Sequence, residues 1–247
     1  MNVPWELFIP LLAGHIIGDF WLQTDVIVNN RKHSVRWMFL HTGIVALTTW
    51  FIVGDFANVG VLLAVFFAHT IIDGGKKIFE NIQGADYTRA NINILLIDQI
   101  LHITALFIIA LILNSYSYYY SYWLELFSYK YLQLLVLVSG LILAVRAAGF
   151  LIEKHLAKFD LEPNEELKDG GQTIGRLERV LVFIFILAGS PEGIGFLIAA
   201  KSIFRIGELR KSEHRKQAEY IIIGSLYSFT YAIIIAYITK YLINWLG

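Results

Sequence analysis

Seven histidine and aspartate residues stand within long apolar stretches of this chain, and their types and spacing could support metal chemistry. They are His15, Asp19, His41, His69, Asp73, Asp98 and His102. Six of them form three pairs four residues apart, so in a helix the two members of each pair lie on one face, one turn apart. Neutral imidazole and carboxylate are ordinary ligands of Zn²⁺ and Mn²⁺. The pattern therefore predicts a divalent metal site, with Zn or Mn as the cofactor.

The cost of placing these groups in a membrane supports the same prediction. An ionisable side chain at the centre of a membrane helix is unfavourable by about 2.5–3.5 kcal/mol, so such groups usually face a bundle interior and pair. A bound cation would offset that cost, and water bound to it, with a pKa lowered toward about 7, would be a nucleophile. The predicted metal ligands are His15, Asp19, His41, His69, Asp73 and His102.

Asp98 has a different predicted role, as the catalytic residue. It would act as a general base or as an acceptor that orients a histidine such as His102. Three residues keep an alternative interpretation: His41 as a hydrogen-bonding residue between helices, and Asp19 and Asp73 as caps of helix ends. A metal-free polar network is the alternative for the whole set.

The stretches that carry these residues are predicted to be membrane helices. Hydrophobic residues make up 57% of the chain and charged residues only 16%, and the charges fall between apolar blocks, as in polytopic membrane proteins. The predicted fold is an all-α, polytopic transmembrane helical bundle with about seven to eight membrane segments. The predicted spans are 5–23, 36–53, 57–73, 92–113, 131–152, 178–190, 193–209 and 218–244.

The positions of the basic residues predict the orientation. All but two of the 20 Lys and Arg residues fall in segments that this arrangement places on one side, the exceptions being Lys130 and Lys240. The positive-inside rule makes that side cytoplasmic, with both termini outside, and it puts the seven His and Asp residues at similar depth in the cytoplasmic half. Acidic and basic residues balance, which predicts no nucleic-acid partner. The absence of cysteine excludes thiolate metal sites.

Four regions follow from this organisation. Residues 1–115 are predicted to form a four-helix transmembrane half with the His/Asp cluster, and residues 116–152 an outer aromatic loop and the fifth membrane helix. Residues 153–175 are predicted to form a cytoplasmic polar loop, and residues 176–247 the C-terminal hairpin, a charged cytoplasmic segment and the last transmembrane helix. In the last region, Gly189-Ser190-Pro191-Glu192-Gly193 predicts a turn between two short helices, a broken or re-entrant hairpin.

Basic residues in the last region are predicted to bind an anionic substrate. The guanidinium fork of arginine suits phosphate, although a fringe of snorkelling residues is the alternative. The predicted substrate-binding residues are Arg176, Arg179, Lys201 and Arg205. Three other histidines, His33, His155 and His214, lie among charged residues and are predicted to be solvated.

The motifs resemble those of a bacterial membrane-protein family, domain-of-unknown-function family 3307. The resemblance rests on His15-Ile-Ile-Gly-Asp19-Phe-Trp-Leu-Gln23, His41, His69-x-x-x-Asp73 and Asp98-Gln99-x-x-His102, and on Ile174-Gly-Arg-Leu-Glu-Arg179 in the second half. It implies a bacterial inner-membrane location and no particular activity. The His/Asp pattern is also loosely similar to membrane-bound metal-dependent hydrolases.

The leading functional hypothesis is an inner-membrane metalloprotein, a metal-dependent hydrolase of a membrane-associated substrate such as a phosphorylated lipid at the cytoplasmic leaflet. Its partners would be the lipid bilayer and an anionic lipid or small-molecule substrate. A transporter or proton-coupled carrier is the first alternative, because intramembrane His/Asp chains also relay protons and broken hairpins also build substrate sites. A membrane sensor or scaffold is the second.

Overall fold

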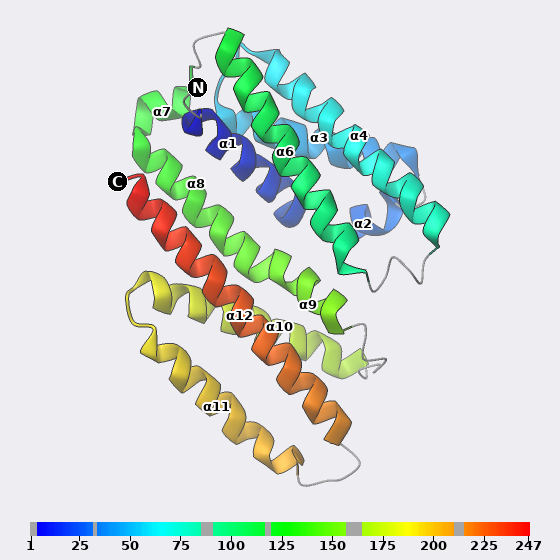
Figure 1. Ribbon diagram of the computed structural model, residues 1–247, viewed down its shortest axis with the longest axis vertical. Coiled ribbons are helices and arrows are strands. Elements are labelled where there is room, and N and C mark those ends of the chain that lie inside the picture. The colour runs from blue at the N-terminus through cyan, green and yellow to red at the C-terminus, as the bar shows by residue number, and fades with distance from the viewer. Residues whose placement is uncertain (1–3, 32–33, 85–90, 117–119, 157–164, 210–214) are drawn as a thin grey trace. The chain divides into compact units, whose positions relative to one another are not determined.

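The computed structural model describes residues 4–31, 34–84, 91–116, 120–156, 165–209 and 215–247, without the side chains of residues 115–116, 165–169, 204–209 and 215–219. Within these ranges the chain is helical apart from short turns and contains no strand (Figure 1). The predicted all-α class is confirmed. The first helices are α1 (Trp5–Ile16), the π-helical turn η1 (Ile17–Trp21), α2 (Asp25–Arg31), α3 (Val35–Val53), α4 (Val59–Gln83), α6 (Ile92–Tyr116), α7 (Tyr122–Phe127) and α8 (Tyr129–Ile142). They are followed by η2 (Leu143–Ala147), α9 (Ala148–Leu156), α10 (Glu165–Leu187), α11 (Glu192–Leu209) and α12 (Arg215–Trp245).

Five helices of the described chain are long and apolar enough to cross a membrane, as expected of an integral membrane protein. They are Val35–Val53, Val59–Gln83, Ile92–Asn114, Tyr129–Leu156 and Tyr220–Trp245. A sixth span results if the bent pair Trp5–Trp21 and Asp25–Arg31 counts as one. The predicted seven to eight segments are thus not confirmed. The limbs of the predicted hairpin, α10 and α11, are not among the candidates because charged residues interrupt their apolar stretches.

The chain divides into two compact units, Met1–Ile142 with Trp245–Gly247, and Leu143–Asn244. The division falls inside the predicted region 116–152. In the first unit, α1, α3, α4 and α6 pack against one another in a four-helix bundle (Figure 1). Its apolar core includes Leu7, Leu11, Ala46, Val65 and Leu106, each at most 4% exposed.

Two glycines on the first helical segment allow it to approach α3 closely. A Cβ atom at Gly14 would lie 2.4 Å from Thr49 Cα, and one at Gly18 would lie 2.8 Å from Val45 Cα. Small residues four apart are a common way for membrane helices to bring their backbones together. Because His15 and Asp19 directly follow these glycines, the close approach brings the first His/Asp pair toward α3.

The first helical segment changes geometry at Asp19. The amide of Leu22 donates to the carbonyl of Ile17 at 2.9 Å, a five-residue step that widens the helix into the π-helical turn η1. Beyond η1 the chain bends by 88° into α2. This bend directs α2, and Arg31 at its end, back toward the bundle, where Lys77 of α4 donates to the Arg31 carbonyl at 3.2 Å.

The end of the bundle where α3 ends is closed by aromatic residues. Gly54 ends α3 in the left-handed conformation, with φ of 74°, and Trp123 of α7 donates to the carbonyl of Phe51 at 2.7 Å. Ser121 caps α7 and donates to the carbonyl of Val53 at 2.8 Å. Part of the predicted aromatic loop is therefore the short helix α7, while residues 117–119 lie outside the described chain.

In the second unit, the predicted break in the hairpin is confirmed. Helix α10 ends at Leu187 and α11 begins at Glu192, and Gly189 between them has φ of 80°, a conformation that favours glycine. The polar loop predicted for residues 153–175 is wrong in extent, because α9 continues to Leu156 and α10 already begins at Glu165. The two glycines of 170–171 lower helix stability without ending the helix.

His155 was predicted to be solvated, and the structure corrects this. It lies in α9, half-buried, with its ring 4.6 Å from that of Tyr227 and its Nδ1 atom 3.2 Å from the Tyr231 hydroxyl. The signal was hidden because both tyrosines lie on α12, more than 70 residues away. His33 and His214 lie outside the described residues.

Candidate metal centre

The four helices of the bundle bring the seven His and Asp side chains together. The first helical segment supplies His15 and Asp19, α3 supplies His41, α4 supplies His69 and Asp73, and α6 supplies Asp98 and His102. All are buried except Asp19, which is half-buried. The predicted i, i+4 spacing therefore does place each pair on an inward face.

Four of these side chains form the tightest group. The Nε2 atom of His41 lies 3.1 Å from Asp19 Oδ1 and 3.2 Å from His69 Nε2. Asp73 Oδ2 lies 3.6 Å from both of these imidazole nitrogens. Three helices thus direct two carboxylates and two imidazoles at one point.

The potential ligand atoms also fall into two overlapping triads, and His69 belongs to both. In the first triad, Asp19, His41 and His69 offer ligand atoms within 4.8 Å of one another. In the second, His69, Asp73 and His102 do the same. Substitution of His69 would therefore disturb either candidate position.

His102 has an orientation that its neighbours determine. Its Nδ1 atom lies 2.9 Å from the backbone carbonyl of Asp98, one turn earlier on α6. Because a carbonyl can only accept, Nδ1 carries the proton and Nε2 keeps a free lone pair. Asp98 was predicted to orient a histidine through its carboxylate, whereas here its backbone carbonyl holds His102.

The carboxylate of Asp98 instead forms an ion pair. Lys76 of α4 donates to Asp98 Oδ2 at 2.8 Å. Its other oxygen, Oδ1, is buried, has no hydrogen-bond partner and lies 3.8 Å from His102 Nδ1. Asp98 therefore contacts His102 but none of the four side chains of the tightest group directly.

Sequence reasoning missed three residues that hold the aspartates. Arg31 Nη1 lies 3.4 Å from Asp73 Oδ2, and Gln99 donates to both Asp19 and Asp98 at 3.3 Å. Lys76 completes the set. Lys76 could have been found, since it lies three residues after Asp73 and so one turn further along the same helix. Nothing in the sequence connects Arg31 with Asp73, because the 88° bend before α2 brings them together.

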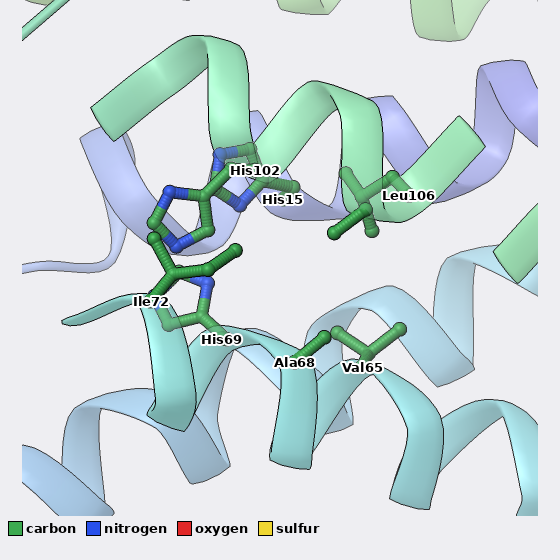
Figure 2. A pocket seen from close by; sticks show the side chains of 8 residues that line it. His15, Val65, Ala68, His69, Ile72, His102 and Leu106 are labelled. Atoms are coloured by element: carbon green, nitrogen blue, oxygen red, sulfur yellow. The ribbon is translucent and has the colours of Figure 1, made fainter. Parts of the chain in front are cut away.

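A small pocket lies beside the tight group, between α4 and α6 (Figure 2). It has room for roughly one water molecule. The imidazoles of His15, His69 and His102 form its polar end, and Val65 and Leu106 belong to its apolar wall. The rings of His15 and His102 stack with centroids 4.9 Å apart. The Nε2 atoms of both are buried and have no hydrogen-bond partner.

The predicted anion-binding residues belong to the second unit. Arg179 is 6% exposed and donates to Ser228 Oγ at 3.0 Å and to the carbonyl of Val145 at 2.9 Å. Lys201 forms an ion pair with Glu178 at 2.6 Å. Arg176 is exposed and contacts Gln172 at 3.4 Å. Arg205 lies in α11, and its side chain is outside the described part of the chain.

Comparison with known protein families gives one match. The profile described as a protein of unknown function (DUF3307) covers residues 7–132. The chain belongs to this family. The matched region contains all seven His and Asp residues of the centre and none of the four basic residues predicted to bind substrate. No curated protein and no solved structure matches the chain. The comparisons show no likeness to metal-dependent hydrolases, so that part of the prediction remains untested.

Proposed function

We propose that this protein is a membrane metalloprotein whose His/Asp centre binds a divalent cation, Zn²⁺ or Mn²⁺, and supports hydrolysis of a membrane-associated substrate. The observation that carries the proposal is the convergence of Asp19, His41, His69 and Asp73. Four of the separations between their ligand atoms are 3.1, 3.2, 3.6 and 3.6 Å. For metal–ligand distances of about 2.0–2.1 Å, the edge of a tetrahedron is about 3.3–3.4 Å. Either triad, Asp19–His41–His69 or His69–Asp73–His102, therefore offers three ligands to one ion and leaves a position open for water.

The donor set supports a cation better than a metal-free network does. Two imidazole nitrogens, His41 Nε2 and His69 Nε2, face each other at 3.2 Å with two carboxylates beside them. Without a cation, at most a few protons can be shared among these four acceptor-rich groups, and buried carboxylates are costly unless compensated. A divalent ion bound by one of the two triads would satisfy the imidazole nitrogens and the carboxylate of that triad at once. His15 and His102, also predicted as ligands, remain available for a second ion or for substrate.

When bound, the ion would act as a Lewis acid and lower the pKa of water. The surrounding residues would prepare the ligands. Arg31 and Gln99 hold the carboxylates of Asp73 and Asp19, and such outer contacts fix ligand orientation. The backbone carbonyl of Asp98 keeps His102 in one tautomer, and the carboxylate of Asp98, paired with Lys76, would accept a proton. The apolar core adjoins the centre, since Leu11, Val65 and Leu106 lie one turn from His15, His69 and His102.

The membrane location carries the rest of the proposal. We place the centre in the cytoplasmic half of a bacterial inner membrane, because the basic residues gather on that side. Arg176, Arg179, Lys201 and Arg205 would attract an anionic lipid head group there. Arg179 supports this role, since its buried guanidinium has only neutral described hydrogen-bond partners and its Nε atom has none.

One observation favours a second candidate, a proton-coupled carrier. Polar contacts of at most 3.2 Å connect an aspartate with two buried histidines, and intramembrane chains of Asp and His relay protons. The chain runs from Asp19 through His41 to His69, and Gln99 holds Asp19 beside Asp98. Proton flux into proteoliposomes without covalent turnover would favour this function.

Elemental analysis of the purified full-length protein tests the proposal. We expect stoichiometric Zn or Mn in the wild type, loss of that metal in His69→Ala, and retention in the matched control His155→Ala, a histidine of the second unit. Affinity tags must be removed first, since they bind metal. Absence of metal from the wild type after loading with Zn²⁺ and Mn²⁺ would refute the metal centre. Retention of metal by His69→Ala would refute the assigned ligands.

Measuring substrate hydrolysis is the next step of the test. Metal-loaded wild type is expected to release product from phospholipid or polyprenyl-phosphate substrates, and His69→Ala is expected to release none. A metal-loaded protein that hydrolyses none of these substrates but moves protons would replace the hydrolase with the carrier.

A further inference from the structure

The pocket between α4 and α6 combines a polar end with an apolar mouth. At the polar end, the Nε2 atoms of His15 and His102 are buried and unpartnered, and these side chains are only 1% and 3% exposed. An unmet lone pair or N–H in such surroundings is costly unless a ligand or water satisfies it. With an ion held by Asp19, His41 and His69, both nitrogens stay free for another ligand, since His15 belongs to neither candidate triad and His102 only to the second. The pocket therefore offers a polar ligand site of its own.

The mouth of the pocket is formed by small side chains. Of the lining residues, Ala68 and Ala105 are half-buried, together with Ile72, whereas Val65 and Leu106 are buried. The half-buried residues mark where the pocket reaches the surface of the bundle. Ala68 on α4 and Ala105 on α6 both line the pocket, so larger side chains at these positions would narrow it. Figure 2 shows Ala68 and Val65 on α4 across from Leu106 on α6.

The surface around this mouth is apolar. Ile71 follows Ala68 by three residues, and Leu101 and Ile108 flank Ala105 by four and three residues, so all three share the edge of their helix with the mouth. They are 72%, 49% and 48% exposed. No Lys, Arg, Asp or Glu lines the pocket. In a helix long enough to cross a membrane, such an edge faces lipid chains and not water.

The tautomer of His102 determines the kind of head group that fits. Its Nδ1–H group donates to the backbone carbonyl of Asp98, so its Nε2 atom is a hydrogen-bond acceptor. A hydroxyl group is the complementary donor, and its single oxygen matches a pocket with room for roughly one water molecule.

We propose that this pocket binds the hydroxyl group of a membrane amphiphile, which enters sideways from the bilayer through the gap at Ala68 and Ala105. The inference rests on the proposed function in one respect: it names a lipid alcohol as the substrate or product that reaches the centre. The site itself is defined by His15 and His102 and does not depend on a bound ion.

Chemical modification of His102 tests the site in nanodiscs. Diethyl pyrocarbonate reacts with an unprotonated, unpartnered imidazole nitrogen, and the modified peptide is quantified by mass spectrometry. The probes are 1-dodecanol, dodecane, which has the chain without the hydroxyl, and ethanol, which has the hydroxyl without the chain. At ten times its Kd, 1-dodecanol should slow modification of His102 about tenfold. Dodecane and ethanol should leave the rate unchanged at equal concentration.

Two variants test the route of entry. Ala105→Leu and Ala68→Leu each fill the gap and should slow modification of His102 at least about tenfold even without a competitor, because bulky groups are poorly tolerated in a packed interface. Thr104→Leu is the matched control, since it introduces the same side chain at an exposed neighbouring position of α6. Thermal unfolding of each variant confirms that it remains folded.

The outcomes separate this inference from the metal centre. Equal protection by ethanol, equal protection by dodecane, or unchanged modification in both folded gap variants would overturn the lipid route or the hydroxyl site. Protection by 1-dodecanol in protein that binds no metal would support the pocket while refuting the proposed metal centre. Stoichiometric metal without protection would refute only the pocket.

Discussion

The contact between Gly14 and Thr49 offers a direct test of how the fold positions the centre. A Cβ atom at Gly14 would lie 2.4 Å from Thr49 Cα, 2.8 Å from its hydroxyl and 2.9 Å from its Cβ. Two of these three atoms are carbon atoms at or next to the backbone of α3, so no side-chain rotation relieves the clash. Since ordinary contacts begin at 3.4 Å, Gly14→Ala must move the first helical segment and α3 apart by about 1 Å.

The expected cost follows from that displacement. Inserting a methyl group into a packed interface typically costs about 1–3 kcal/mol. His15 follows Gly14, and Asp19 lies one turn later, so the displacement also widens the 3.1 Å separation between Asp19 and His41. Misplacement of ligands by outer contacts typically lowers metal affinity about 10–100-fold. We expect Gly14→Ala to lower both the free energy of unfolding and the metal affinity.

Gly43→Ala is the matched control for this experiment. Gly43 lies inside α3, the helix that Gly14 of α1 contacts, but no neighbouring atom lies within 4 Å of its added Cβ. The change should therefore be neutral or stabilise the helix by up to about 1 kcal/mol. Unfolding is followed by tryptophan fluorescence in detergent micelles, and metal affinity by titration. Equal unfolding free energies and metal affinities for the two variants would refute the reasoning that the Gly14 contact positions the centre.

Two further predictions concern buried charges. Lys76→Gln leaves Asp98 without its ion-pair partner and should lower the free energy of unfolding by about 1–3 kcal/mol. This loss lies below the range for fully buried pairs because Lys76 is 22% exposed. Adding Asp98→Asn should restore part of the loss, and a double variant no more stable than Lys76→Gln would contradict this prediction. Arg179→Lys cannot reproduce both the Ser228 and the Val145 contacts, so it should cost about 1–3 kcal/mol, whereas the exposed Arg176→Lys should cost nothing measurable in the same unfolding assay.

Local features of the fold could be read from the sequence. The i, i+4 pairs put His69 with Asp73 and Asp98 with His102 on inward helix faces, because that periodicity is a property of one helix and needs no partner. The turn at Gly189 was readable for the same reason, since proline and glycine act on their own backbone. Helix ends such as Val53 and Leu187 fell within a few residues of the predicted spans.

Features that depend on two helices could not be read in this way. Charge composition assigned Arg31 and Lys76 to solvated loops, yet both reach back to aspartates of the centre. The apolar stretch predicted a membrane span that ends at Asp73. The helix α4 itself continues to Gln83, because a helix can leave the apolar layer without unwinding. The closeness of Gly14 to Thr49 depends on which faces pack together, and one sequence does not specify that choice.

The π-helical turn at Ile17–Trp21 also limits how the length of this segment can vary. It contains one residue more than an ordinary helix needs for the same advance, and each residue in an ordinary helix corresponds to a rotation of about 100°. The turn absorbs this extra residue without turning His15 against the residues that follow. Removing one residue other than Asp19 from the turn would therefore return it to ordinary helix and keep His15 and Gln23, whose amide lies 3.5 Å from His41, on the side of the bundle. Adding a residue would instead rotate these two side chains against each other by about 100°, so this segment should tolerate shortening by one residue better than lengthening.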